Sequence, residues 1–435
     1  MGPPLSRLRR GQDSVLKRWK QFSAWQRLTL AGLCLLTLLA AGALVWHGNP
    51  GVAARGAEVL RGLIGDENVA RLETWVLGWQ DTFQSWVYTA GGDKPQAPFA
   101  SVTPGLVALL PTSTARPISS ATDSHPLPTA TATPGERVQA QTPTPSPTPA
   151  PANQPAPLKP LGRVAGEGAW SVFMSNPAGQ PVGFRTFLQP DGQRPYAEAA
   201  VVAIDLTATR LRYVLGNVEP VAIDPTLQIN RPGRIPANDF KSGWLVAAFN
   251  GGFRTRHGQF GVMINGVVLL APRESLGTVA IYDDGHVALG PWGEAAGEIF
   301  YADDLRNWRQ NGPLIVQNGQ INPHTADPSP EDWGYTVGGD TATWRSGIGL
   351  SADGHTLFYV GGPFLTLPAL AAAMKNTGAN NAIQLDINDY WVNFEAIHYS
   401  VGGLTTQLLM DGMKNDDRYL RSFDRDFFYV VANPN

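Results

Sequence analysis

Residues 91–160 carry the feature that most limits what this chain can fold into. They hold a long tract of proline, threonine, serine and alanine that includes QTPTPSPTPAPANQPAP. Such a composition buries too little apolar surface to fold, and proline stiffens it toward an extended polyproline II spacer. Tracts of this kind are also typical of O-glycosylated stalks. We therefore expect a disordered stalk that holds a folded unit, residues 161–435, away from a membrane.

The N-terminal end of the chain is basic, although the chain as a whole is acidic. Residues 1–27 contain seven lysines and arginines against one aspartate, whereas the formal net charge of the 435 residues is −3. A basic tail on an acidic body argues against nucleic-acid binding and favours a role in membrane orientation. We expect residues 1–27 to form a cytoplasmic tail.

An apolar run without a charged residue, Leu28–Trp46, follows this tail directly. A helix of about 20 apolar residues spans the hydrocarbon core, and the basic residues before it keep the N-terminus in the cytoplasm. The alternative is a cleaved signal peptide, but the run exceeds the usual apolar core of about 7–15 residues. We therefore expect an uncleaved signal-anchor, a single membrane pass and an extracytoplasmic C-terminal domain. The only cysteine, Cys34, lies within the run, so the exported part has no disulfide and must rely on a large core.

Residues 53–90 repeat apolar side chains at helical spacing, with a break near Gly65. This pattern predicts two amphipathic helices. Three uses are open for their apolar faces: self-association, a position on the membrane surface, or packing on a partner.

Hairpin signals recur through the folded unit. Asn-Gly or Asp-Gly pairs between apolar runs are the strongest short-range signal for a hairpin. They stand at residues 265–266, 284–285, 318–319 and 353–354. One helix is expected, LPALAAAMKNTG, with Pro368 in its first turn and Gly378 as its end. The sequence predicts an α+β domain of antiparallel-strand-rich mixed sheets with few helices.

A first candidate site lies where the buried strand in WLVAAFNGGFR ends. The strand is followed by Asn250, Gly251, Gly252 and, after Phe253, by Arg254. Paired glycines allow unusual backbone angles and a close approach of backbone N–H groups to a ligand. An ordinary tight turn has the same composition, so this segment alone does not specify a function.

A second candidate is Arg345, which stands before a run of small residues in TWRSGIG. In a pocket, an arginine holds a phosphate or carboxylate through two parallel hydrogen bonds. A single arginine beside glycines is more often a surface residue. Arg345 alone therefore does not distinguish an anion-binding residue from a surface residue.

The third candidate is the strand end in NAIQLDINDYWVNF. Apolar residues lead to Asp386, and Asp389, Tyr390 and Trp391 follow. Ligand crevices often form at strand ends, and carboxylates there suit acid–base work or charge stabilisation. The two aspartates equally suit a turn, and the two aromatic rings either offer a flat face to a sugar or belong to the core.

Metal and histidine chemistry receive little support from the sequence. Asp386, Asn388 and Asp389 are neighbouring oxygen donors, which keeps a divalent cation open as an alternative, but three local donors are too few for a site. The histidines lack metal-type spacing, and His324, in a polar loop, is a candidate for substrate binding. We expect no cofactor.

The order of these segments closely resembles the phosphodiester glycosidase family. The resemblance runs from about residue 201 to RDFFYVV at residues 425–431, and its most specific parts are NGGF, RSGIG and the run that ends at Asp386. It implies that Asn250, Arg345 and Asp386 are active-site residues. The family usually continues Leu-Asp with glycines and a serine, whereas this chain continues with Ile387, Asn388 and Asp389.

The resemblance implies an extracytoplasmic hydrolase that cleaves a sugar-1-phosphodiester in cell-surface or extracellular glycans. In that reaction a carboxylate lies beside the oxocarbenium-like carbon and positive charge stabilises the departing phosphate. Asp386 suits the first role, Arg345 the second, and Asp389 the activation of water. The alternative is a non-catalytic module that binds glycans or sugar phosphates and has lost turnover with the glycine loop.

Overall fold

The structure, a computed structural model, describes residues 50–92, 95–99, 151–293, 303–326, 333, 338–400, 403–414 and 417–434. The predicted tail and signal-anchor, residues 1–46, lie outside the described residues, as does the stalk from residue 100 to residue 150. Within the described ranges no helix is both long and apolar enough to cross a membrane. The membrane pass therefore stays a prediction.

The largest sheet has eight strands in the order β1-β2-β3-β14-β13-β15-β11-β12. Each neighbouring pair is antiparallel, so the mixed pairing expected from the sequence is absent from the described strands of this sheet. The strands are β1 (Ser171–Ser175), β2 (Pro181–Leu188), β3 (Ala199–Asp205), β14 (Thr356–Leu365), β13 (Thr343–Leu350), β15 (Asn381–Ile387), β11 (Leu314–Gln317) and β12 (Gln320–Ile321). Asp386 lies at the end of β15, between β13 and β11.

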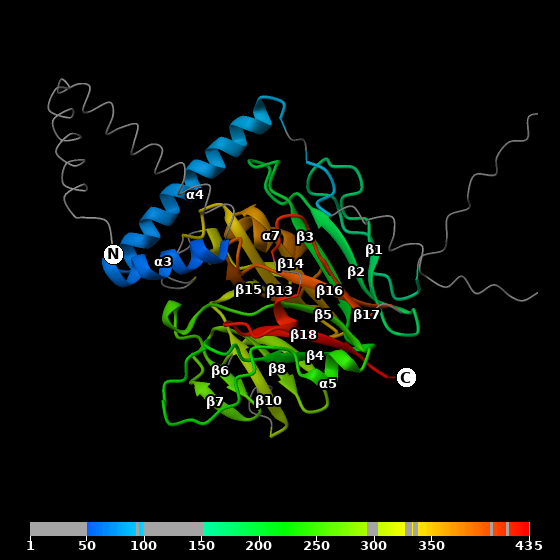
Figure 1. The fold of residues 1–435 in the computed structure, drawn as a ribbon. Helices are drawn as coiled ribbons and strands as arrows, with labels where there is room; N and C mark the ends of the chain where they lie inside the picture. The colour runs from blue at the N-terminus through cyan, green and yellow to red at the C-terminus, as the bar shows by residue number, and fades with distance from the viewer. Residues whose placement is uncertain are drawn as a thin grey trace, which may run out of the picture.

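Two further antiparallel sheets of five strands complete the body. One has the order β17 (Gly403–Leu408), β16 (Phe394–Ser400), β5 (Leu245–Asn250), β18 (Phe427–Ala432) and β4 (Thr209–Val214). The other has the order β7 (Val267–Leu270), β6 (Val262–Ile264), β10 (Leu305–Gln310), β8 (Gly277–Tyr282) and β9 (Val287–Pro291). Figure 1 shows β5, β16 and β18 between the largest sheet and the strands of the third sheet. The predicted α+β class with few helices is confirmed.

The three sheets share one apolar core. The ring of Phe249 on β5 stacks on Phe394 of β16 and on Phe428 of β18, with centroids 5.6 and 5.5 Å apart. Tyr359 of β14 lies 5.4 Å from Phe249, and Ile281 of β8 belongs to the same cluster. Aromatic contacts of this kind add to the burial of their large apolar area. The core therefore packs the end of β5 against β14 of the largest sheet.

Helix α7 (Leu367–Asn376) covers the outer face of the largest sheet with Leu370 and Met374. Thr366 caps it, because its side-chain oxygen accepts a hydrogen bond from the amide of Ala369 at 3.2 Å. Gly378, at φ 87°, ends it. The predicted helix is confirmed. A shorter helix, α5 (Ala237–Lys241), was not predicted.

All four predicted hairpins are present. They join β6 to β7, β8 to β9, β11 to β12 and β13 to β14. Asn265 and Gly266 have φ angles of 50° and 77°, and Asn318 and Gly319 have 49° and 72°. Two successive positive φ angles are what a two-residue hairpin turn requires, which is why asparagine and glycine are found there.

The two predicted amphipathic helices are also present. They are α3 (Pro50–Ile64) and α4 (Asp66–Thr89), and Gly65, at φ 87°, separates them. Arg61 of α3 donates to Glu73 of α4 at 2.6 Å and holds the two helices as a hairpin. Figure 1 shows this hairpin on one side of the body.

Helix α4 packs on the folded domain. The Asp81 carboxylate accepts hydrogen bonds from Arg194 Nε at 3.0 Å and from the Tyr196 hydroxyl at 2.7 Å. Leu77 packs against an apolar cluster that includes Phe253 and Ile387. The domain is therefore in direct contact with the helices that precede the stalk.

Both described ends of the Pro/Thr-rich segment also contact the domain. The amide of Asp411 donates to the carbonyl of Pro98 at 3.1 Å, and Arg185 lies 4.3 Å above the ring of Phe99. On the other side, the amide of Leu158 donates to Gly168. The helices before the Pro/Thr-rich segment and its two described ends thus contact the folded unit. Residues 100–150 of the expected stalk lie outside the described residues, so the stalk stays a prediction.

Candidate active site

Asp386 lies where the largest sheet meets the sheet that contains β5. It is the sixth residue of the buried strand β15 and is only 5% exposed. Its amide donates to the carbonyl of Gly251, just after β5, at 3.1 Å. Its own carbonyl accepts from the Ser346 hydroxyl of β13 at 2.8 Å. Backbone contacts to two other strands thus fix its position before the side chain makes any contact.

The carboxylate of Asp386 forms a buried ion pair with Arg425, a residue that the site prediction did not contain. The Oδ2 atom lies 2.5 Å from Arg425 Nη2, and Oδ1 accepts the amide of Ile387 at 3.0 Å. Arg425 Nη2 also donates to the carbonyl of Gly252 at 3.0 Å. Burial raises the pKa of Asp386 to about 6, although the nearby charge of Arg425 acts in the opposite direction.

A second buried ion pair supports the first. Asp426 Oδ2 accepts from Arg309 Nε at 2.7 Å and from the Tyr213 hydroxyl at 2.9 Å. Arg309 Nη2 in turn donates to the carbonyl of Phe253 at 2.5 Å. One ion pair, which joins β4, β10 and the start of β18, thus clamps the NGGF loop next to Asp386.

Two buried polar atoms directly before β18 have no hydrogen-bond partner among the described residues. They are the donor Nε of Arg425 and the acceptor Oδ1 of Asp426. A buried polar atom without a partner is costly, and such atoms are typical of ligand-binding and catalytic sites. Both therefore favour a polar ligand beside Asp386.

Aromatic and cationic side chains line the same region. The guanidinium carbon of Arg425 lies 4.7 Å from the ring centroid of Trp391, and that of Arg254 lies 5.8 Å from it. Tyr390 contacts Trp391 edge to face but lies under Arg418 instead. The structure thus brings the predicted residues Asp386, Arg254 and Trp391 together around Arg425, with Tyr390 at the margin.

His257 shows how cationic the surroundings are. It is buried in the short helix η2 (Thr255–His257) and accepts from Arg256 Nε at 3.1 Å. Burial, followed by the charges of Arg425 and Arg256, lowers the pKa of His257 to about 2. It is therefore neutral at physiological pH, mainly because it is buried, and the arginine charges that add to this effect suit an anionic ligand.

The guanidinium of Arg345 makes four hydrogen bonds within the protein. It donates to the carbonyls of Leu365 (2.9 Å), Gly338 (2.9 Å) and Thr341 (3.0 Å) and to the side chain of Gln384 (2.8 Å). Its backbone pairs with Ile387, next to Asp386. None of these four hydrogen-bond partners of its side chain is a carboxylate or a site residue. Burial lowers the pKa of Arg345 to about 10. In this structure Arg345 ties a loop to the sheet rather than facing Asp386.

Asn250 is likewise engaged on all sides. Its Nδ2 donates to the Ser346 hydroxyl (3.0 Å) and to the carbonyl of Gly251 (3.1 Å). Its Oδ1 accepts from the Tyr359 hydroxyl (3.0 Å) and from the amide of Asn393 (3.1 Å). This amide therefore orients the strand ends around Asp386 and has no capacity left for a sugar hydroxyl.

The two glycines are required by packing. A Cβ atom at Gly251 would lie 2.7 Å from the carbonyl oxygen and from Oδ2 of Asp426, and one at Gly252 would lie 3.0 Å from the guanidinium of Arg309. The amide of Gly251 donates to the carbonyl of Asp426, so it is not free for a ligand. The paired glycines were expected to let the backbone approach a ligand closely. In the structure they let the backbone approach the Asp426–Arg309 ion pair instead.

The residues after Asp386 form a turn. Asn388 has φ 91°, and its side-chain oxygen accepts the amide of Tyr390 at 3.0 Å, so it occupies a position that favours glycine. Asp389 is half-buried in this turn. Because Asp386 pairs with Arg425 and Asn388 with the backbone, the geometry gives the alternative cation site no support. Among the described residues no group of three or more His, Cys, Asp or Glu side chains is placed to hold a metal ion.

His324 lies apart from this group. It is exposed in the short helix η4 (Pro323–Ala326), which packs against α7, and its amide donates to the side chain of Asn322. No hydrogen bond or ring contact in the described part of the chain joins it to Asp386 or Arg425.

A cavity of about 350 Å³ is lined by residues that include Arg212, Asp239 and Tyr429. Neither Asp386 nor Arg425 lines it.

Comparison with known proteins agrees with this location. Residues 244–386 match the family model described as phosphodiester glycosidase. The segment is related to phosphodiester glycosidases. The resemblance expected from the sequence is therefore confirmed over these residues, and the match ends at Asp386, where the departure from the family pattern begins. A search of curated proteins found no match.

Three solved structures show distant similarity. The auto-inhibited catalytic domain of zebrafish N-acetylglucosamine-1-phosphodiester alpha-N-acetylglucosaminidase is 13% identical, with a TM-score of 0.37 over 60% of this chain and 86% of that chain. A hypothetical protein from Synechocystis is 14% identical, with a TM-score of 0.32 over 61% and 62%. A putative exported protein from Burkholderia pseudomallei is 11% identical, with a TM-score of 0.23 over 55% and 74%.

The sequence reasoning missed Arg425, Asp426, Arg309 and His257. Arg425 and Asp426 stand directly before the apolar run of β18, as Asp386 and Asn250 stand at the ends of β15 and β5. A search for polar residues at every strand boundary would have found them. Their pairing depends on the contact between two sheets, which the sequence does not reveal.

Proposed function

We propose that the domain is an extracytoplasmic glycosidase that hydrolyses the bond between the anomeric carbon of a sugar and a phosphodiester oxygen. The observation that carries the proposal is the buried Asp386–Arg425 pair at the end of the segment related to phosphodiester glycosidases. It joins a carboxylate with a raised pKa to a cluster of positive charge. Those are the two features that this reaction needs.

The chemistry divides between the two members of the pair. A phosphomonoester is a good leaving group, so the site has more need of charge stabilisation than of a strong acid. Asp386 would stabilise the oxocarbenium-like carbon. Arg425, through its unpartnered Nε, and Arg254 would bind the departing phosphate. Trp391, in contact with both arginines, would form one wall for the sugar ring.

The other predicted site residues receive supporting roles in this proposal. Arg345 and Asn250 would be positioning residues, because their side chains bind neighbouring strands and loops. Gly251 and Gly252 would allow the second ion pair to approach the loop. Asp389 remains the proposed base for water, three residues beyond Asp386 in the same turn.

The location outside the cytoplasm rests on the sequence. The basic residues before Leu28–Trp46 favour a cytoplasmic N-terminus, which places the domain on the other side of the membrane. A protease added to intact cells should digest the domain and leave the tail protected. Protection of the domain would contradict this location.

A direct test is the release of free sugar from a panel of sugar-1-phosphodiesters by the full chain in detergent. We expect turnover by the wild type and a loss of at least about 100-fold in Asp386→Asn, as for the removal of a charged catalytic group. Asp353→Asn is the matched control, because Asp353 lies exposed in the turn between β13 and β14. It should keep wild-type turnover.

The alternative is a glycan-binding module without turnover, which the bulky Tyr390 and Trp391 after Asp386 favour. It predicts no release from any member of the panel, together with saturable binding that weakens in Arg425→Gln. Full activity of Asp386→Asn would reject the proposed site.

A further inference from the structure

The outward face of α4 carries a continuous stripe of large apolar side chains. Its members share one side of the helix and are each more than 45% exposed. They are Leu72 (46%), Trp75 (63%), Trp79 (63%), Phe83 (61%) and Trp86 (65%). At about 100° per residue, these positions fall within an arc of about 80°. Trp75 contacts Trp79, and Phe83 contacts Trp86, with ring centroids 6.2 and 6.0 Å apart.

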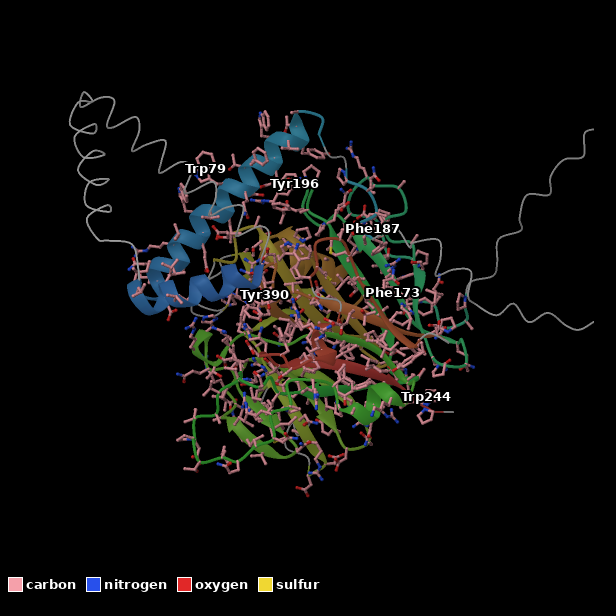
Figure 2. The ribbon with its side chains drawn as sticks, viewed as in Figure 1. Trp79, Phe173, Phe187, Tyr196, Trp244 and Tyr390 are labelled. Carbon is pink, nitrogen blue, oxygen red and sulfur yellow. The ribbon has the colours of Figure 1, made fainter. Side chains whose placement is uncertain are left out.

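The opposite side of the same helix is already occupied. Leu77 and Asp81 point about half a turn away from the stripe and contact the folded domain. Figure 2 shows Trp79 on the side of α4 away from the body and Tyr196, the partner of Asp81, on the side toward it. The stripe therefore is not the face that the domain needs for packing.

The size of the stripe calls for a partner. A buried tryptophan or phenylalanine covers about 150–250 Å², so four that are about 60% exposed present on the order of 500 Å² of aromatic surface. This equals the largest apolar patch of a typical monomer, and patches of that size mark interaction sites. Single exposed apolar residues need no such explanation, but a contiguous row does.

Two observations select the lipid bilayer as the partner. Tryptophan dominates the stripe, and its ring, apolar with one N–H donor, prefers the interface between lipid and water. Only three residues separate the end of the apolar run Leu28–Trp46 from the start of α3 at Pro50, a step of four positions. At about 3.5 Å per residue, this connection reaches roughly 14 Å, so a helix hairpin that follows it is held at the membrane surface.

We propose that α4 lies in the outer interface of the bilayer that holds residues 28–46, with its aromatic stripe among the lipid headgroups and upper acyl chains. The inference does not depend on the activity of the domain. It also fixes the distance of the candidate site from the lipid. Because Leu77 packs on the cluster that contains Ile387, Asp386 is separated from the bilayer by about the thickness of one helix, roughly 10 Å.

The test uses the full chain in vesicles of zwitterionic phosphatidylcholine, with Cys34→Ser to remove the only cysteine. A nitrobenzoxadiazole fluorophore is attached to Trp79→Cys, or to Phe83→Cys, on the stripe. The matched control is Thr74→Cys, an exposed position on the same helix about 140° from Trp79. Circular dichroism checks that each labelled chain keeps its fold.

We expect the labels at positions 79 and 83 to emit at shorter wavelength than the label at position 74. Nitroxide groups on the lipid chains should quench them several-fold more strongly, and aqueous Co²⁺ should quench the control label more strongly. Equal access of Co²⁺ to all three positions would overturn the proposal. So would protection from both quenchers that grows with protein density, because that result assigns the stripe to a second copy of the chain.

Discussion

Asp386 Oδ2 lies 2.5 Å from Arg425 Nη2, although Asp386 is the next-to-last residue of β15 in the largest sheet and Arg425 precedes β18 of another sheet. The candidate site therefore exists only where the two sheets meet. Each partner favours the charged form of the other: Arg425 lowers the pKa of Asp386 against the effect of burial, and Asp386 raises the pKa of Arg425 against the same effect. The predictions below follow from that relationship.

The first prediction concerns the pH dependence of activity. Burial raises the pKa of Asp386 to about 6, and the proposed role needs the ionised carboxylate. The value of kcat/KM for sugar release should therefore rise with pH and level off above about 6, because this parameter reports groups of the free enzyme. A profile that is flat from pH 4 to 8, or that rises near pH 4, would contradict a buried catalytic Asp386.

The second prediction concerns stability and pH. An aspartate titrates near 3.9 in an unfolded chain, so between pH 4 and 6 the folded state binds more protons at Asp386 than the unfolded state does. The free energy of unfolding should therefore fall as pH rises through this window, by up to about 3 kcal/mol. Urea unfolding of the wild type and of Asp386→Asn across this range isolates the effect. If the free energy of unfolding depended on pH in the same way for both proteins, the raised pKa of Asp386 would be contradicted.

The third prediction separates the two arginines. Arg345→Lys removes a planar donor that serves four acceptors, so it should lower the free energy of unfolding by about 2–4 kcal/mol while KM changes little. Arg425→Lys should instead lower kcat/KM by 10-fold or more, because a phosphate ligand loses its Nε donor. Melting curves and kinetics on the same preparations would show the split. The reverse pattern would return the phosphate role to Arg345.

The fourth prediction compares a buried ion pair with an exposed one. Asp426→Asn leaves the Arg309 cation buried without its charge partner, so it should cost about 3–5 kcal/mol of stability. Asp283→Asn removes the partner of Arg306, whose side chain is 44% exposed, and should cost less than about 1 kcal/mol. Chemical denaturation measures both. Similar costs would mean that the Asp426–Arg309 pair does not hold the loop.

Local features of the fold followed from the sequence because their causes are local. The hairpin at Asn265-Gly266 needs two positive φ angles, and the helix that ends at Gly378 carries its own stop. The apolar run that ends at Asp386 likewise marks a buried strand and its end. Each of these depends on fewer than about ten neighbouring residues.

The partners of the site could not be predicted in the same way. Arg425 meets Asp386 only because β18 pairs with β5, and β5 contacts β15 through Gly251. Arg345 was expected to face a phosphate, but nearby carbonyl groups of a loop occupy its donors. A sequence shows which residue types stand at strand ends, whereas the packing of sheets decides which of them meet.

The most direct test of the central claim is the fate of solvent oxygen during hydrolysis in H₂¹⁸O. Cleavage of the bond between the anomeric carbon and oxygen leaves all original oxygen atoms on the released phosphomonoester. The account therefore predicts no ¹⁸O shift in its ³¹P NMR signal, and this product does not exchange oxygen with water on the time scale of the assay. Incorporation of one ¹⁸O atom into the phosphomonoester would show cleavage of the phosphorus–oxygen bond and would contradict a glycosidase.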